Sequence, residues 1–270
     1  NALMDSTRRF ARIVGPGLTG LLLIFLSLPD FFTLDAITFA ISALSLILIK
    51  RYFQDPTSRH EEEKASITSP KADIVEAILL LRNHNVLKWS LLSLGLVNCA
   101  WGIAYMVGAS LFTKHILLED IGVYGLLGAV YGIGNILSLF IFGSGGRNIS
   151  KMFVGQVILG IGFLIFATSH SILVASIGIV IAAFGSPIGD LILLTLIQTE
   201  FPSKHIGKIY SMRALIGGTG LSLGALIAGP LFSILSIQFV IATSAIFIVC
   251  VGVIGIVCMK ASKVRSSVQC

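Results

Sequence analysis

Long apolar runs follow one another along almost the whole chain, at a length and spacing typical of membrane-spanning helices. A span needs about 20 consecutive apolar residues to cross the hydrocarbon core of a bilayer. The runs lie at 11–28, 31–49, 90–112, 121–142, 152–169, 172–197, 212–235 and 237–259. Each must be helical, because backbone N–H and C=O groups in lipid find partners only within the segment. The pattern therefore predicts an all-α integral membrane protein with eight transmembrane helices, two before a polar linker and six after it.

Composition supports this prediction and argues against other classes. Of the 270 residues, 55% are hydrophobic and only 12% are charged, about half the charged fraction of a soluble domain. The net charge of +6 does not indicate nucleic-acid binding, because the basic residues do not cluster on a soluble face. The four cysteines lack CxxC spacing, so neither a disulfide framework nor a metal site is expected. The chain also lacks a glycine-rich phosphate loop followed by Lys-Ser or Lys-Thr, and we expect neither an ATP-driven pump nor a cofactor.

Lysine and arginine are distributed very unevenly over the connections between the spans. All of them except Lys114, 18 of 19, fall in connections that lie on the same side of the membrane. Basic connections stay in the cytoplasm, so this side is predicted to be cytoplasmic. An even number of spans then places both ends of this chain there, in the cell (inner) membrane.

The polar linker divides the chain into regions. We expect two helices in 1–49, a central cytoplasmic linker in 50–89, a six-helix unit in 90–260 and a cytoplasmic tail in 261–270. Within the linker, Ser69 can cap a helix and Pro70 suits its first position. The apolar residues that then share one face are Ile74, Ala77, Ile78 and Leu81. This pattern predicts an amphipathic helix that either lies on the cytoplasmic surface or binds a regulatory partner.

Three short motifs accompany this arrangement of two plus six spans. The first span carries Arg12-Ile13-Val14-Gly15-Pro16-Gly17-Leu18-Thr19-Gly20. Residues 198–210 place Pro202 before Gly207-Lys208, and the seventh span contains Gly229-Pro230. Together these features resemble helices five to twelve of a major facilitator superfamily transporter. They are similar to the branch that exports drugs, macrolides and siderophores.

The resemblance implies a twelve-helix transporter in which this chain lacks the first four helices. It implies secondary active efflux of drug-like or siderophore-like molecules by alternating access, driven by protons. The partners would be the lipid bilayer, a small-molecule substrate, protons and the missing N-terminal helices, with no nucleic acid. The chain alone is then expected to be inactive. An importer or lipid facilitator of the same fold, or a receptor or scaffold derived from it, is the alternative.

Asp190 is the acidic residue placed deepest in a predicted span. An ionised, unpaired acid at such a depth costs at least a few kcal/mol. Three roles remain open: coupling to protons, pairing with Arg213 or a linker base, and contact with substrate. Pro187, three residues earlier, cannot donate a backbone hydrogen bond and is expected to kink or break the helix. An intramembrane enzyme is not expected, because the spans offer no second carboxylate to share a proton with Asp190.

Aromatic and amide residues recur at helical spacing in two neighbouring spans. Asn98, Trp101 and Tyr105 are three and four residues apart, and Tyr131 and Asn135 are four apart. Such spacing places each set on one face of its helix. We expect these faces to line a cavity for a bulky, partly apolar ligand. The alternative is an aromatic belt at the membrane interface, or plain packing.

Glycines are frequent in the last six spans. Gly128 and Gly132 form a small-xxx-small pair, which permits close approach of helices in lipid. The other glycines expected to pack closely are Gly155, Gly160, Gly162, Gly217, Gly218, Gly220 and Gly224. In a transporter the same surfaces could also allow helices to slide.

Overall fold

The computed structural model describes residues 26, 28–52, 70–82, 84–142 and 148–268, and the regular structure in them is entirely helical. Its elements are α2 (Leu28–Tyr52), α4 (Pro70–Arg82), α5 (Asn85–Trp101), the π-helix η1 (Gly102–Val107), α6 (Gly108–His115), α7 (Ile121–Phe142), α8 (Ile149–Ala167), α9 (Ile172–Glu200), α10 (Ser203–Ile234) and α11 (Ile237–Val268). In this part of the chain, seven helical segments are long and apolar enough to cross a membrane. They match the second to eighth predicted spans. The first predicted span lies almost entirely outside the described residues, as do Arg12, Gly15, Pro16 and Gly20.

Helices extend beyond the predicted spans where polar residues continue them. The seventh span is predicted from residue 212, but α10 begins at Ser203. The first ten residues of α10 include Lys204, His205 and Lys208, which lower hydropathy without opposing helix formation. A hydropathy pattern detects the part of a helix inside the hydrocarbon and misses a continuation into the headgroup region.

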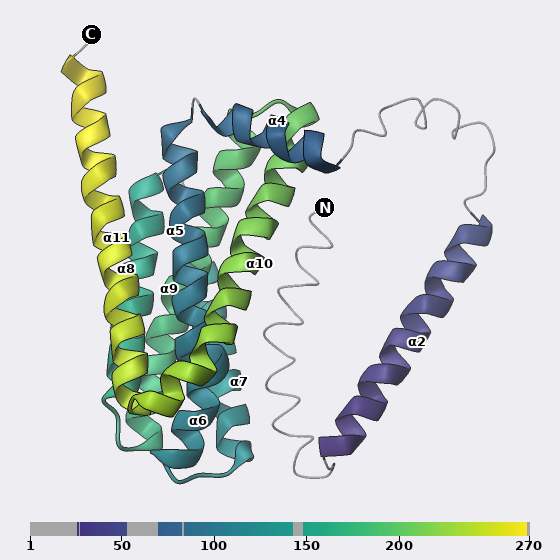
Figure 1. The fold of residues 1–270 in the computed structure, drawn as a ribbon, viewed down its shortest axis with the longest axis vertical. Helices are drawn as coiled ribbons and strands as arrows, with labels where there is room; N and C mark the ends of the chain where they lie inside the picture. Colours follow the sequence, from purple (N-terminus) through teal and green to yellow (C-terminus); the bar gives the residue numbers. More distant parts are fainter. Residues whose placement is uncertain (1–25, 27, 53–69, 83, 143–147, 269–270) are drawn as a thin grey trace.

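The spanning segments that follow α4 form one bundle, whereas α2 stands apart from it (Figure 1). Within the bundle α8 packs against α9 and α11, and α9 packs against α7 as well. The segment α5–η1–α6 packs against α10 and α11. In Figure 1 α4 lies across one end of the bundle, roughly perpendicular to the spans. None of the α2 side chains that the structure describes, those of residues 29–48, is buried.

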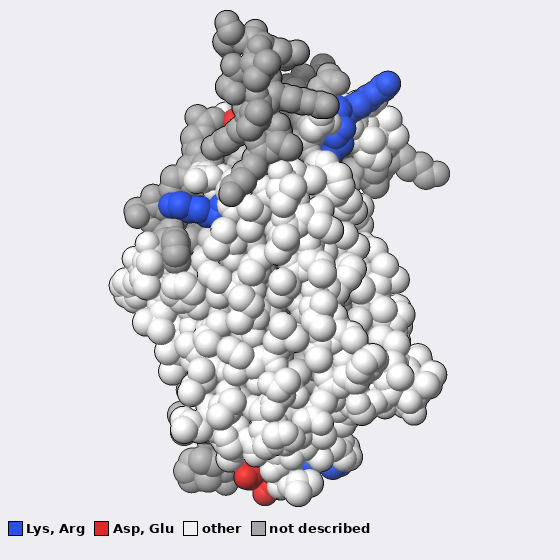
Figure 2. Space-filling model, turned by 90° about the vertical axis from the view of Figure 1, so that its left-hand side faces the viewer, with Lys and Arg blue, Asp and Glu red and all other residues white. Residues whose placement is uncertain are grey.

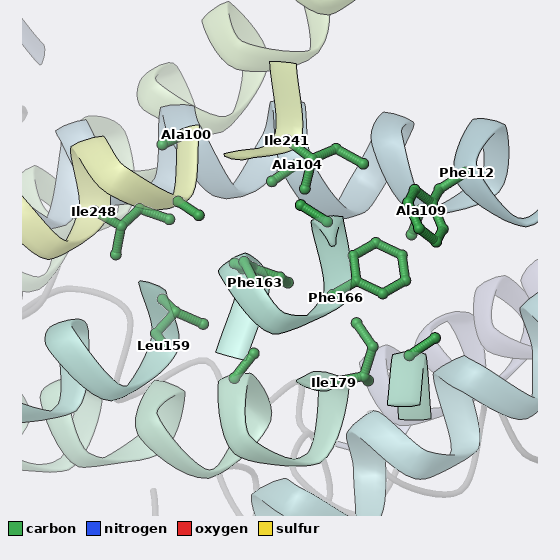
Figure 3. Packing of buried hydrophobic residues seen from close by; sticks show 14 of the residues in the cluster. Ala100, Ala104, Ala109, Phe112, Leu159, Phe163, Phe166, Ile179, Ile241 and Ile248 are labelled. Atoms are coloured by element: carbon green, nitrogen blue, oxygen red, sulfur yellow. The ribbon is translucent and has the colours of Figure 1, made fainter. Parts of the chain in front are cut away.

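The centre of the bundle is filled by small side chains on one helix and phenylalanines on another (Figure 3). Phe163 and Phe166 of α8 are fully buried against Ala104 and Ala109, and Ile241 of α11 joins them. In lipid the hydrophobic effect does not drive helices together, so close packing of this kind must hold them.

Several glycines bring helix backbones into direct contact. A Cβ at Gly220 or Gly224 of α10 would overlap the backbone of Gly95 or Cys99 in α5. A Cβ at Gly155 would lie 2.6 Å from the Gly185 carbonyl oxygen, and one at Gly160 would lie 2.8 Å from the Ala245 carbonyl oxygen. These contacts fit the close packing predicted for these four glycines, and their partners lie in α5, α9 and α11.

Other glycines of the sequence analysis do not pack in this way. A Cβ at Gly207, Gly218 or Gly229 would meet nothing within 4 Å, and all three are exposed in the described chain. For Gly218 the predicted close contact is therefore absent within the described residues. Gly132 is buried and Gly128 half-buried on α7.

Of the two effects predicted for Pro187, a break is wrong, because α9 continues from Ile172 to Glu200 with Pro187 inside it, whereas a kink stays a prediction. Gly185, two residues before the proline, packs against the backbone of Gly155 and Leu159 in α8. Contact with α8 therefore continues beside the proline. A proline inside a span is tolerated where neighbouring helices help to satisfy the backbone groups that it leaves unpaired.

Charged residues on the visible face of the bundle lie towards its two ends. Figure 2 shows lysine, arginine, aspartate and glutamate there, with a broad uncharged zone between them. Charged groups are costly inside the hydrocarbon and are tolerated at the interfaces. This distribution agrees with an integral membrane protein.

Candidate functional site

Three of the five residues predicted to line a cavity meet in one aromatic cluster. The Nε1 of Trp101 donates a hydrogen bond to the Tyr131 hydroxyl at 3.1 Å. The Tyr105 and Tyr131 rings are stacked with centroids 4.5 Å apart, and the Tyr105 and Trp101 centroids are 5.2 Å apart. Phe163 of α8 lies behind them, 6.0 Å from Tyr105 between ring centroids. The three polar aromatic residues are half-buried, so the cluster combines an apolar surface with hydroxyl and indole groups.

Tyr105 of this cluster lies in the π-helix η1. A π-helix closes i→i+5 hydrogen bonds. Tyr105 follows Trp101 by four residues, and the two rings lie on the same side of the span. Gly102, the first residue of η1, packs so closely that a Cβ would lie 3.0 Å from the Leu221 carbonyl oxygen of α10. Sequence reasoning assumed a regular α-helix and missed η1, although such turns occur frequently at functional sites.

Of the two predicted amide residues, Asn98 has a hydrogen-bond partner on another helix. Asn98 donates a hydrogen bond from Nδ2 to the Gly217 carbonyl oxygen at 3.2 Å, which joins α5 to α10. A side chain at Gly217 would place its Cβ 3.1 Å from that nitrogen. Asn135 is half-buried on α7, one turn beyond Tyr131. Asn98 thus makes an interhelical contact rather than a contact with the aromatic cluster.

Asp190 and Arg213 form a charged contact between α9 and α10. The Nη2 of Arg213 donates to Asp190 Oδ1 at 2.6 Å. The side chain of Asp190 is 36% exposed and that of Arg213 is 22% exposed. The Nε of Arg213 is buried without a hydrogen-bond partner among the described residues. Both residues lie in segments able to span the membrane. The arginine is one of the bases named for Asp190 from sequence.

A second contact joins the same two helices nearer their connection. Gln198 donates from Nε2 to the Tyr210 hydroxyl at 2.8 Å. Gln198 follows Asp190 by eight residues, or about 12 Å along a helix. Two side-chain contacts, about 12 Å apart along α9, therefore join α9 to α10 near their connection.

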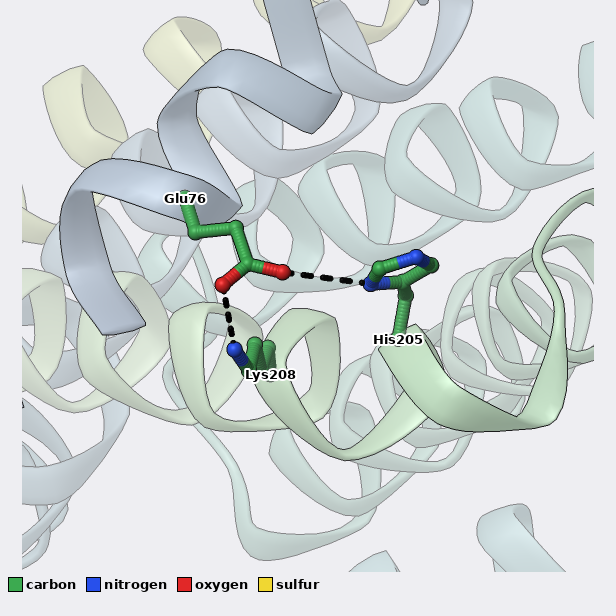
Figure 4. Close-up of polar contacts among 3 residues, drawn as sticks. All are labelled: Glu76, His205 and Lys208. Atoms are coloured by element: carbon green, nitrogen blue, oxygen red, sulfur yellow. Dashed lines mark hydrogen bonds and ion pairs between the residues drawn. The ribbon is translucent and has the colours of Figure 1, made fainter. Parts of the chain in front are cut away.

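Glu76 of α4 joins two basic residues of α10 (Figure 4). Lys208 Nζ donates to Glu76 Oε2 at 2.5 Å, and His205 Nδ1 lies 3.4 Å from Glu76 Oε1. The two bases are three residues apart and share one helix face. Sequence reasoning missed this contact, since neither the acidic residue in α4 nor the two bases indicates which partner it meets.

A shallow groove of about 320 Å³ lies at the end of the bundle away from α4. It is lined by Ala167, Thr168, His170, Gln238, Phe239 and Ala242. None of the residues predicted to bind substrate or protons contributes to it. In the described part of the chain, no three His, Cys, Asp or Glu side chains are grouped so that they could hold a metal ion.

The chain is similar to an uncharacterized major facilitator superfamily (MFS)-type transporter, y4rN, of Sinorhizobium fredii. The two are 26% identical over 248 residues, which cover 90% of this chain. The chain spans 59% of the length of that relative. No family model matches the chain, and no solved structure matches it. The similarity and the seven segments that are long and apolar enough to cross a membrane are consistent with an integral membrane protein that has an MFS-like helical bundle.

Proposed function

We propose that the protein containing this chain is a secondary active exporter of bulky, partly aromatic small molecules, of the drug-like or siderophore-like kind. It works by alternating access, and protons drive it through Asp190. The observation that carries the proposal is the half-buried aromatic cluster, in which Trp101 and Tyr131 from two spans share a hydrogen bond.

The aromatic cluster has the chemistry that a site for such molecules needs. Binding sites for small molecules are mostly apolar, with a few polar groups that fix orientation. Trp101, Tyr105 and Tyr131 offer ring faces for stacking, and the Tyr131 hydroxyl accepts the indole hydrogen bond. Since the rings come from α5, η1 and α7, a relative movement of these helices would change the shape of the site.

Proton coupling is assigned to Asp190 because its ion pair joins two spanning helices. When Asp190 is ionised, it balances the charge of Arg213. When it takes up a proton, the electrostatic part of the contact is lost and α9 and α10 are held less firmly. A proton taken up or released there can thus favour one conformation of the transporter over the other.

A matched pair of tyrosine substitutions tests the substrate site. Tyr131→Phe removes the acceptor of the Trp101 hydrogen bond, whereas Tyr210→Phe removes a hydroxyl at the end of α10, outside the cluster. In cells that express the full-length protein, we expect Tyr131→Phe to reduce export of ethidium or of a hydroxamate siderophore. Tyr210→Phe should leave the apparent affinity for the same molecules unchanged. Equal effects of the two substitutions on that affinity would contradict the assignment.

A further inference from the structure

The helix α4 has two apolar faces, and the bundle covers only one of them. Ala77 and Leu81 are 1% and 7% exposed and pack against the bundle. Val75, Ile78 and Leu79 are 55%, 55% and 57% exposed. Ile78, which the sequence pattern groups with Ala77 and Leu81 on one apolar face, is exposed, whereas those two residues are buried.

The exposed apolar residues of α4 form a regular stripe that ends in a cation. This outer stripe consists of Val75, Ile78, Leu79 and the exposed Arg82, which occupy positions i, i+3, i+4 and i+7 of one helix face. In the next helix Lys88 donates from Nζ to the Arg82 carbonyl oxygen at 2.9 Å, so a second cation lies at the same end of α4. This end of the stripe is basic.

The contacts of Glu76 fix the rotation of α4 about its own axis. Glu76 lies at the edge of the buried face and reaches Lys208 and His205 of α10. With Ala77 and Leu81 packed beside it, α4 cannot turn the outer stripe towards the bundle without breaking these contacts. The outer stripe is thus a fixed surface.

The helix α4 lies at the level where the spanning segments of the bundle end. It lies across the end of the spans, roughly perpendicular to them (Figure 1). Directly after it, Trp89 and Leu92 of α5 are 47% and 50% exposed, so apolar surface continues from α4 into the spanning region. Exposed tryptophan is typical of the boundary between headgroups and acyl chains.

We propose that the outer stripe of α4 binds the lipid surface of the cytoplasmic leaflet. Val75, Ile78 and Leu79 enter the boundary between acyl chains and headgroups, and Arg82 meets the lipid phosphates. An interfacial helix of this kind buries its apolar face about 5–10 Å into that boundary and keeps its cations at the headgroups. Anionic lipids strengthen the contact through the basic end of the helix. Through this contact the lipid holds α4 in the plane of the membrane.

Spin labels at single cysteines test the proposal. The full-length protein, with its other cysteines replaced by alanine, is labelled at Ile78→Cys or Leu79→Cys. It is reconstituted in vesicles of phosphatidylcholine and phosphatidylglycerol. The relaxation of the spin label is then measured with oxygen, which concentrates in lipid, and separately with a water-soluble nickel chelate. Ala77→Cys on the buried face and Glu119→Cys in the exposed connection between α6 and α7 serve as controls.

The proposal expects labels at Ile78 and Leu79 to be relaxed by oxygen and protected from the nickel chelate. The label at Glu119 should be relaxed several-fold more by the chelate, and the label at Ala77 should be protected from both. Strong relaxation by the chelate at Ile78 and Leu79 would place the stripe in water and overturn the proposal. Protection from both reagents would also overturn it, because another protein segment would then cover the stripe.

Discussion

Arg213 donates a hydrogen bond from Nη2 to Asp190 Oδ1 at 2.6 Å, and this contact joins α10 to α9 within their membrane-spanning segments. An isolated charge at such a depth is costly, so each residue explains why the other is tolerated there. In the proposed mechanism, the charge of Asp190 influences the position of α10 through this contact. The stability and the transport activity of the protein should therefore both respond to its loss.

Asp190→Asn is expected to destabilise the protein and to remove the dependence of transport on the proton gradient. The asparagine leaves Arg213 without a counter-charge. Since both side chains are partly exposed, we expect a cost of about 1–3 kcal/mol, between the values typical of exposed and buried pairs. Thermal unfolding in detergent and export at imposed pH gradients measure the two effects.

Arg213→Gln and the double variant provide the control for this prediction. If the two side chains stabilise the protein through their mutual contact, the two single costs should not add in the double variant. Additive costs would show that the pair does not act as a unit. Unchanged proton dependence in Asp190→Asn would remove Asp190 from the coupling mechanism.

Gly220→Ala is expected to disturb the packing of α10 on α5, whereas Gly218→Ala is not. A Cβ at Gly220 would overlap the backbone of Gly95, while one at Gly218 would meet nothing within 4 Å. Alanine is favoured over glycine inside a helix by up to about 1 kcal/mol, so Gly218→Ala should be neutral or stabilising. Melting temperatures in detergent compare the two variants, and equal melting temperatures would contradict the close contact at Gly220.

Glu76→Gln is expected to loosen α4 from the bundle. The substitution removes the charge that faces Lys208 and His205. Partly exposed ion pairs contribute roughly 0.5–1 kcal/mol, so amide exchange in residues 75–82 should accelerate roughly two- to fivefold. Hydrogen–deuterium exchange measures this rate, with Glu119→Gln at the other end of the bundle as control. An unchanged rate in Glu76→Gln would show that apolar packing alone holds α4.

The ends of the spanning bundle are expected to face opposite sides of the membrane. Lys114 lies at the end of α6, and Lys151 lies in the first turn of α8. In spheroplasts, a membrane-impermeant thiol reagent should label Lys114→Cys and leave Lys151→Cys unlabelled until the membrane is opened. The reverse pattern would invert the orientation predicted from the lysine and arginine distribution.

The spans were predictable because hydropathy acts over about 20 residues and needs no knowledge of partners. The predicted span at 121–142 coincides with α7, and the one at 172–197 ends three residues before α9 does. Helix starts outside the hydrocarbon were harder, as α10 illustrates. The π-helix was not predicted, and its first residue, Gly102, packs closely on Leu221 of α10.

The candidate site was predictable in part for the same reason. Helical spacing grouped Trp101 with Tyr105, and these residues do meet. Spacing also grouped Asn98 with them, but its amide contacts Gly217 of α10. A periodic pattern identifies which residues share a face and gives no information on which helix covers each part of that face. The contact of Glu76 with α10 escaped prediction because it joins residues 132 positions apart.

Flux through the full-length protein in proteoliposomes tests the proposed function most directly. The vesicles are loaded with ethidium or a hydroxamate siderophore, a proton gradient is imposed, and movement of the molecule is followed with and without a protonophore. We predict saturable flux that the protonophore abolishes and that Asp190→Asn uncouples from the gradient. Flux that is absent for both molecules, or equal with and without the proton gradient, would contradict proton-driven export.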